Sequence, residues 1–196
     1  MKDQKKKIFI LMGNPDGNSL SSKIADAYEV GALDVDYEVR RQNLNEMQFD
    51  PILHRGYKEI QELEPDLKTF QENVTWCDHI VVVYPNWWCT MPALLKGLFD
   101  RAWLPGFAFS FRKNDLYGWI KRLKGKTGRI IILADIPELL TWFLFGEFTN
   151  ELARATLGFA GIHPVRITVF SPSERCSPDT RLTWIQKVKK MGHKGR

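Results

Sequence analysis

Three short runs of uninterrupted apolar residues constrain the fold of this chain more than any other feature. They occupy residues 8–12, 80–84 and 130–133. A strand that is buried on both faces is typically a continuous apolar run, because helices cover both sides of its sheet. The three runs therefore predict the central strands of a parallel sheet.

Two further segments alternate between apolar and polar residues. Val35, Tyr37 and Val39 alternate with charged residues, and residues 165–169 repeat the pattern. A period of two is typical of a strand with one wetter face, which suits the edge of a sheet. Helices are predicted between the strands, over residues 20–32 with Ser19 as N-cap, from 66 to 76, from 92 onward, and over 147–157 and 178–190. This alternation predicts an α/β fold with a doubly wound five-stranded parallel sheet, order 2-1-3-4-5, and helices on both faces.

A length of 196 residues favours a single domain over residues 1–196. The net charge of +5 arises at the ends, because residues 1–7 hold four lysines and residues 187–196 hold five basic side chains. We interpret residues 1–7 and 191–196 as basic tails. The body between the ends is acidic overall, which argues against nucleic acid as a partner, since such a partner needs a basic folded face.

Composition excludes several other classes of protein. The three cysteines have no paired spacing, which excludes a disulfide scaffold and a cysteine-type zinc site, and the four histidines have no metal-ligand spacing, so no metal is expected. The apolar stretch 139–146 is far shorter than the roughly 20 residues that span a bilayer. The start does not resemble a signal peptide. We therefore expect a cytoplasmic protein that does not insert into membranes.

In this topology a ligand binds outside the carboxyl ends of the first and third strands. The loop after the first strand, residues 13–21, is small and polar and opens a helix. Free N–H groups at the helix start, with the Ser19 and Ser21 hydroxyls, could hold a phosphate. The loop lacks the lysine of a P-loop, and an ordinary capped turn is an equal alternative.

The loop after the third strand carries two adjacent tryptophans, Trp87 and Trp88, between prolines. Exposed indoles are costly unless they stack on another surface, and a planar ring system would provide one. Packing beneath the next helix, or against another subunit, is the alternative. A phosphate cradle beside an aromatic surface favours a mononucleotide with a flat ring, namely a flavin.

The stretch YPNWWCTMPALLKGLFDR, residues 84–101, resembles the flavin-loop signature of the NAD(P)H:quinone reductases, a DT-diaphorase-like family with a flavodoxin-like fold. Similar segments follow at LPGFAF (104–109), at 43–57 with Phe49-Asp50-Pro51, in the loop 14–21, and at LGFAGI (157–162). The resemblance implies a two-electron reductase that holds FAD or FMN tightly, with FAD favoured. NAD(P)H would be the co-substrate and a quinone-like molecule the acceptor, and a homodimer would complete the active site.

The resemblance also implies roles for individual residues. The phosphate would be held by Asn14, Ser19, Leu20 and Ser21. The flavin ring would contact Pro85, Asn86, Trp87, Trp88 and Cys89, and its edge would contact Ala134 and Asp135. The chain departs from the family pattern where Ala134 and Ile136 replace threonines, where Cys89 replaces a glycine or aromatic residue, and where a proposed Tyr/His proton relay has no counterpart.

Two other functions remain open from the sequence. The altered loop 134–142 suits an ancillary flavoprotein subunit that binds flavin but turns over slowly, as in subunits that attach to ion-efflux systems. A one-electron carrier of flavodoxin type is the other, although the long segment between residues 43 and 65 argues against it.

Overall fold

The computed structural model describes residues 5–112 and 118–196. Its main sheet has five parallel strands in the order β2-β1-β3-β6-β7. These strands are β1 (Lys7–Met12), β2 (Glu38–Asn43), β3 (His79–Pro85), β6 (Thr127–Leu133) and β7 (Val165–Phe170). In chain order this is 2-1-3-4-5, so the predicted flavodoxin-like doubly wound topology is confirmed.

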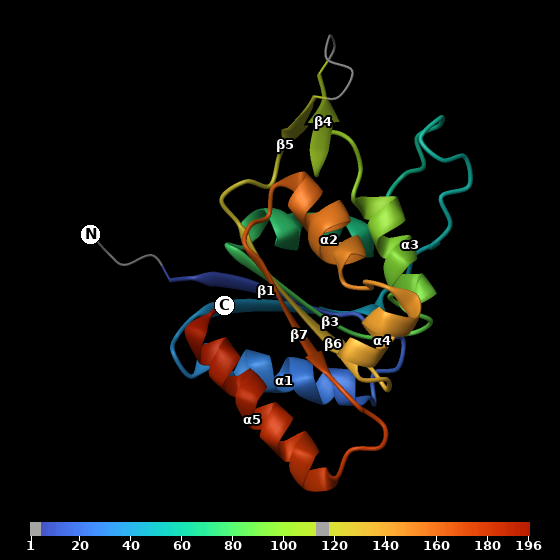
Figure 1. Ribbon diagram of the computed structural model, residues 1–196. Helices are drawn as coiled ribbons and strands as arrows, with labels where there is room; N and C mark the ends of the chain where they lie inside the picture. Colours follow the sequence, from blue (N-terminus) through green and yellow to red (C-terminus); the bar gives the residue numbers. More distant parts are fainter. Residues whose placement is uncertain (1–4, 113–117) are drawn as a thin grey trace.

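Helices cover both faces of the sheet (Figure 1). One face carries α1 (Leu20–Leu33) and α5 (Pro178–Lys194), and the other carries α2 (Pro65–Trp76), α3 (Ala93–Ala102) and the π-helix η2 (Glu151–Gly158). The fully buried strands supply two cores. Ile8 and Ile10 of β1 face the first pair of helices, and Phe9 and Leu11 face the others.

The second strand begins later than the sequence pattern predicts. Residues 34–36 form a turn in which Asp36 has a φ of 62°, and Tyr37 N donates to Ala32 O at 3.2 Å. Pairing with β1 therefore starts at Glu38. The alternation of Val35, Tyr37 and Val39 identified an edge strand correctly but placed its start three residues too early.

Further elements lie outside the predicted pattern. Short helices form at η1 (Leu44–Glu46) and α4 (Glu138–Phe145), and β4 (Phe109–Phe111) pairs antiparallel with β5 (Trp119–Lys121). The predicted helix at 147–157 is instead η2, which starts at Glu151. Within the described residues, no helix is long and apolar enough to cross a membrane.

The C-terminal segment 191–196 is not a tail, contrary to the sequence interpretation. Helix α5 continues through Lys194, and Gly192 is buried against the backbone of Tyr28 in α1. At the other end Lys7 belongs to β1, and Lys6 Nζ donates to Gly195 O at 2.5 Å. Residues 1–4 of the predicted N-terminal tail lie outside the described residues.

Candidate functional site

The candidate site lies where the carboxyl ends of β1, β3 and β6 meet. Met12 at the end of β1 pairs with Val83 of β3. Gly13 N donates to Val83 O at 2.7 Å, and Asn86 N donates to Leu133 O at 2.7 Å. These bonds fix the starts of two loops side by side. The chain switches direction between β1 and β3, which is where open α/β sheets bind ligands.

The loop after β1 forms a tight polar turn before α1. Asn14 Oδ1 accepts from Asp16 N at 2.9 Å, and Asn14 Nδ2 donates to Ser21 Oγ at 3.3 Å. Ser19 caps the helix as predicted, because its Oγ accepts from Ser22 N at 3.4 Å. The loop is thus held by its own side chains.

The first N–H groups of α1 precede the hydrogen-bond ladder of the helix. Lys23 N donates to Ser19 O at 3.3 Å, so the N–H groups of Leu20 and Ser21 lie before this bond. N–H groups in this position, together with the positive end of the helix dipole, form a ready anion site. The arrangement suits a phosphate.

The loop after β3 is a two-residue turn in an unusual conformation. Trp87 N donates to Thr90 O at 2.9 Å, and Thr90 N donates to Trp87 O at 3.1 Å. The central residues Trp88 and Cys89 have φ values of 54° and 61°, a pattern that normally selects Asn and Gly. Trp88 is 98% exposed, so burial does not offset its backbone strain. Strain of this kind at an exposed residue indicates a functional position.

The loop after β6 is tied to the segment that follows β7. Ala134 N donates to Phe170 O at 3.0 Å, and Ser173 N donates to Ala134 O at 2.9 Å. Asp135 Oδ1 accepts from Ser173 Oγ at 3.0 Å and from Glu174 N at 2.8 Å. The Asp135 carboxylate is therefore held in a fixed position beside the site.

A cleft of about 450 Å³ opens between the loops after β3 and β6. Its volume is in the range of small-molecule sites. Beside it, the side-chain oxygen of Asn86 is buried and has no hydrogen-bond partner among the described residues. The cleft is lined by Asn86, Trp88, Cys89, Asp135, Ile136, Thr141 and Phe145.

The structure brings together part of the predicted residue set. Among the predicted ring-binding residues, Asn86, Trp88, Cys89 and Asp135 line the cleft, whereas Pro85, Trp87 and Ala134 adjoin them in the chain without lining it. The predicted phosphate-binding residues lie at the end of the neighbouring strand β1. They are Asn14, Ser19, Leu20 and Ser21. Contacts of either group with a cofactor stay predictions.

Sequence reasoning missed some residues that shape the site. Thr141 and Phe145 reach the cleft from α4, a helix that the sequence marked only as an apolar stretch. Thr90 Oγ1 donates to Glu151 Oε2, which ties the strained turn to η2. No sequence signal links these two residues, which are 61 positions apart. Nearby, burial and the charges of Glu151 and Glu147 raise the pKa of Tyr84, so this phenol stays neutral.

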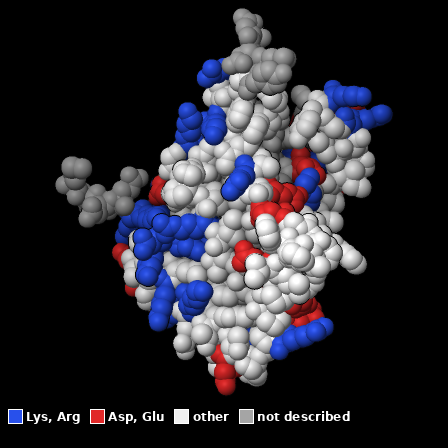
Figure 2. Space-filling view, viewed as in Figure 1, with Lys and Arg blue, Asp and Glu red and all other residues white. Residues whose placement is uncertain are grey.

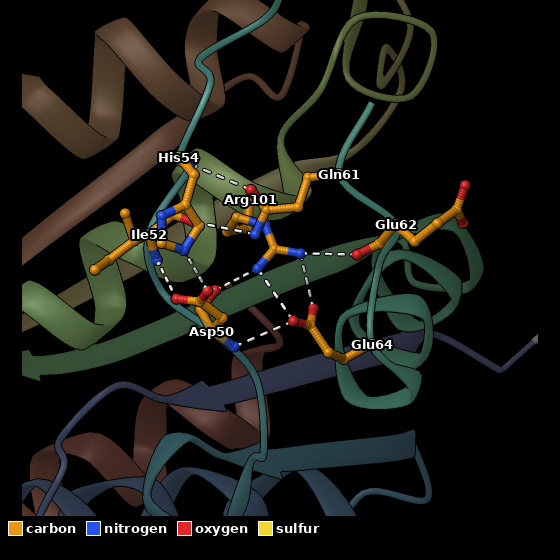
Figure 3. A network of polar contacts seen from close by, with 7 residues as sticks. All are labelled: Asp50, Ile52, His54, Gln61, Glu62, Glu64 and Arg101. Carbon is orange, nitrogen blue, oxygen red and sulfur yellow. Dashed lines mark hydrogen bonds and ion pairs between the residues drawn. The ribbon is translucent and has the colours of Figure 1, made fainter. Parts of the chain in front are cut away.

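A buried arginine fixes the long segment between β2 and α2 (Figure 3). Arg101 of α3 is fully buried, and it donates to Asp50 O, to Glu62 O at 2.9 Å and to Glu64 Oε2 at 2.9 Å. Asp50 Oδ2 also contacts His54 Nε2 at 2.7 Å. One guanidinium on α3 thus holds both ends of an otherwise irregular segment.

A family model described as a flavodoxin-like fold matches residues 6–190. The chain belongs to this family. The flavodoxin-like fold agrees with the strand order and with the position of the cleft at the topological switch point.

Relatives in this flavodoxin-like family include named reductases. Human ribosyldihydronicotinamide dehydrogenase (quinone) is 31% identical over 180 residues, which cover 84% of this chain and 75% of the human protein. YcaK of Escherichia coli K12, an NAD(P)H oxidoreductase by name, is 30% identical, but the match covers 54% of this chain and only 57% of YcaK. The crystal structure of Smu.1420 from Streptococcus mutans UA159 is 27% identical with a TM-score of 0.82, covering 96% of this chain and 99% of that chain.

Proposed function

We propose that this protein is a flavin-dependent NAD(P)H oxidoreductase that reduces a quinone-type acceptor. The observation that carries this proposal is the cleft at the switch point, where a strained, exposed Trp88 stands beside the unpartnered oxygen of Asn86. A flat ring with N–H donors offers both an apolar surface and a hydrogen bond. The names of the relatives at 30% and 31% identity support the same class of reaction.

The residues present fit a flavin. Asn86 Oδ1 needs a donor, the turn at Trp88 and Cys89 presents backbone and indole surface, and the N–H groups of Leu20 and Ser21 suit a phosphate. FAD and FMN both contain the flat ring and a phosphate that these residues would bind, and FAD is the favoured of the two. When bound, the flavin would supply the redox chemistry, accepting two electrons as a hydride from NAD(P)H and passing them to the acceptor.

The protein's own part in the reaction is to position and shield. Ile136 and Phe145 line the cleft with apolar surface, which would exclude water from the reacting atoms. Asp135 is held by Ser173 and Glu174, so it can hold a polar edge in one orientation. We propose that NAD(P)H and the acceptor bind in turn against the flavin held in this cleft, as in a ping-pong mechanism.

Purified protein is expected to carry flavin, or to acquire it on incubation, and to oxidise NAD(P)H rapidly only when a quinone is added. The test measures absorbance of the bound flavin, its identity by mass after denaturation, and the rate of NAD(P)H oxidation with and without a quinone. Protein that binds no flavin would refute the proposal. Bound flavin with turnover no faster than the quinone-free rate would refute the enzymatic role and favour an ancillary flavoprotein.

The Trp88→Asn variant tests the site within the same experiment. Asn tolerates a positive φ, so the variant should gain about 1 kcal/mol in the free energy of unfolding without flavin. Loss of the indole surface should weaken flavin binding by about tenfold or more. Leu182→Asn replaces another exposed apolar side chain, on α5, and should leave flavin affinity unchanged. Equal flavin affinities for wild type and Trp88→Asn would contradict the assignment.

We further propose that two copies of the chain associate through α4. This helix leaves several large apolar side chains exposed, with Leu139 at 79% and Phe143 at 78%. Monomers rarely leave such a contiguous patch in water, and symmetric dimers are the commonest way to cover one. Since Thr141 and Phe145 of α4 line the cleft, a second copy on this helix would also close the flavin site.

Light scattering is therefore expected to give twice the 22.8 kDa of one chain. Phe143→Asp should shift the mass to that of the monomer and weaken flavin binding, because a buried unpaired carboxylate is costly in an interface. Leu182→Asp, at an exposed position on α5, should leave both unchanged. A wild-type mass of one chain would refute the dimer without bearing on the reductase activity.

A further inference from the structure

Three buried polar atoms without partners in the described part of the chain lie between α1 and the amino-terminal halves of β3 and β6, away from the proposed flavin cleft. They are Tyr28 Oη, His79 Nε2 and Arg129 Nε, and no described residue hydrogen-bonds to any of them. Their side chains are all at least nine-tenths buried. Buried polar groups in proteins are almost always paired, so an unpaired group needs a specific explanation.

The three side chains are neighbours, although they come from three elements. The rings of Tyr28 and His79 stack at a centroid distance of 6.4 Å and an interplanar angle of 18°. Arg129 is close enough for its charge to act on both rings. His79 of β3 pairs with Thr127 of β6, and Arg129 lies two residues further along the same face. The unpaired atoms thus share one region between the sheet and α1.

Further cations surround this region. Arg166 of β7 is the strand partner of Arg129, and the charges of Lys6, Arg166 and Arg196 all act within the same group. Lys6 Nζ is held by Gly195 O, and Arg129 Nη1 donates to Thr168 Oγ1 at 2.9 Å. Figure 2 shows Lys and Arg side chains concentrated on the side where β1 begins and α5 ends.

Carboxylates do not balance these cations. Within the described ranges 5–112 and 118–196, none of Lys6, Arg129, Arg166 and Arg196 forms an ion pair with an acidic side chain. Among the residues that the structure describes, the charge of Asp78 acts on Lys6, and Asp78 Oδ2 accepts from Lys7 N at 2.9 Å. The region therefore has an excess of positive charge.

The pKa values of His79 and Arg129 reflect this excess of positive charge. Burial, followed by the charges of Lys6, Arg129 and Arg166, lowers the pKa of His79 to about 3. Burial and neighbouring arginines also lower the pKa of Arg129. His79 is therefore neutral at physiological pH, with Nδ1 against Thr127 Oγ1 at 2.7 Å.

We propose that this cluster, formed by Tyr28, His79, Arg129, Arg166, Lys6 and Arg196, binds a small multivalent oxyanion of the phosphate class. Such an ion offers several acceptor oxygens for the guanidinium and phenol donors and supplies the missing negative charge. A water molecule would satisfy the unpaired atoms but leave the charge uncompensated. The buried donors favour a small ion over a nucleic acid backbone, which would reach only the exposed arginines.

The cluster is separate from the flavin phosphate cradle. Lys6 precedes the first residue of β1, and Asn14 follows its last residue by two positions. Six residues of extended strand span about 20 Å, so Lys6 and the phosphate cradle lie at opposite ends of β1, and Arg129 lies between them at the level of Ile10. A phosphate bound here could not be the phosphate of a flavin in the cleft.

Isothermal titration with inorganic phosphate, in the presence and absence of saturating FAD, tests this site. One phosphate should bind per chain under both conditions, and phosphate should raise the melting temperature more than sodium chloride at equal ionic strength. Arg129→Gln should raise the dissociation constant for phosphate by about tenfold or more, since a charged hydrogen-bond donor is lost. Arg166→Gln, at an exposed position, should raise the dissociation constant about threefold or more.

The matched control is Arg154→Gln, an exposed arginine on η2 at the other face of the sheet, which should bind phosphate as the wild type does. Dissociation constants for Arg129→Gln and Arg166→Gln within twofold of the wild-type value would overturn the proposal. A rise in melting temperature with phosphate no greater than that with sodium chloride would also overturn it. That result would mean that water, and not an anion, occupies the buried atoms. Tighter binding of a single-stranded oligonucleotide than of phosphate, lost in Arg166→Gln, would replace the small-ion site by a nucleic acid surface.

Discussion

Replacing Arg101 by methionine is expected to lower the free energy of unfolding by about 3–5 kcal/mol, the usual cost of removing one member of a buried ion pair. Arg101 is fully buried, and its guanidinium contacts Asp50 O, Glu62 O and the Glu64 carboxylate. Methionine fills a similar volume but cannot donate. The variant would leave two carbonyls and one partly buried carboxylate without their donor.

Lys96→Met on the same helix is the matched control. Lys96 pairs with Asp100 at 2.7 Å, but both side chains are nearly half exposed. Exposed pairs of this kind contribute little, so the control should lose less than about 1 kcal/mol. Urea unfolding followed by circular dichroism measures both variants. A loss at Arg101→Met no larger than that of the control would show that the network does not stabilise the fold.

The contacts of Arg101 with Glu64 also make the free energy of unfolding depend on pH. Burial opposes ionisation of Glu64, but the hydrogen bonds from Arg101 and from the backbone N–H groups of Glu64 and Asp50, together with the charge of Arg101, hold the pKa of Glu64 below its ordinary value of 4.5. A carboxyl whose pKa is lower in the folded state stabilises the fold above pH 4.5 and loses that contribution as the pH falls through the folded pKa. The difference in stability between wild type and Arg101→Met should therefore shrink in this acid range.

Gly31→Ala is the second substitution with a large expected effect. An alanine Cβ at this position would lie 2.0 Å from Lys189 O, and one at Gly192 would lie 2.2 Å from Tyr28 O. Helices α1 and α5 thus touch backbone to backbone through two glycines. Alanine in a helix normally adds stability, but here it would push the helices apart, with a loss of about 2–3 kcal/mol or more.

Val30→Ala, at an exposed neighbouring position, controls for the effect of a substitution in α1 and should change the free energy of unfolding by about 0.5 kcal/mol or less. Thermal unfolding compares the two variants. If Gly31→Ala proves more stable than the wild type, the close approach of the two helices is wrong.

The sequence could predict the sheet because each strand carries its own burial pattern. The continuous runs became β1, β3 and β6, and the alternating segments became the edge strands β2 and β7. Local pattern could not locate the start of β2, because a positive φ at Asp36 adds a turn after α1. It also could not reveal that α5 continues to Lys194, since that depends on contact with α1.

The location of the candidate site could be predicted from the sequence, but its detailed conformation could not. Topology and unusual loop composition located Asn86, Trp88 and Cys89 at one strand end, and these residues line the cleft. The conformation of the turn was not predictable, because Trp and Cys rarely adopt positive φ. The burial of Arg101 had one overlooked signal. It stands three residues after Leu98, on the core-facing side of α3, where an arginine needs partners from elsewhere in the chain.

Contact between Lys6 and Gly195 places the two ends of the described chain next to each other. An affinity tag joined at the carboxyl end would therefore start beside the cations of the basic cluster. An acidic or phosphorylated extension could occupy the cluster from within the same polypeptide. Proteins prepared with and without such extensions should accordingly be compared at the same ionic strength before any anion affinity is assigned to the fold itself.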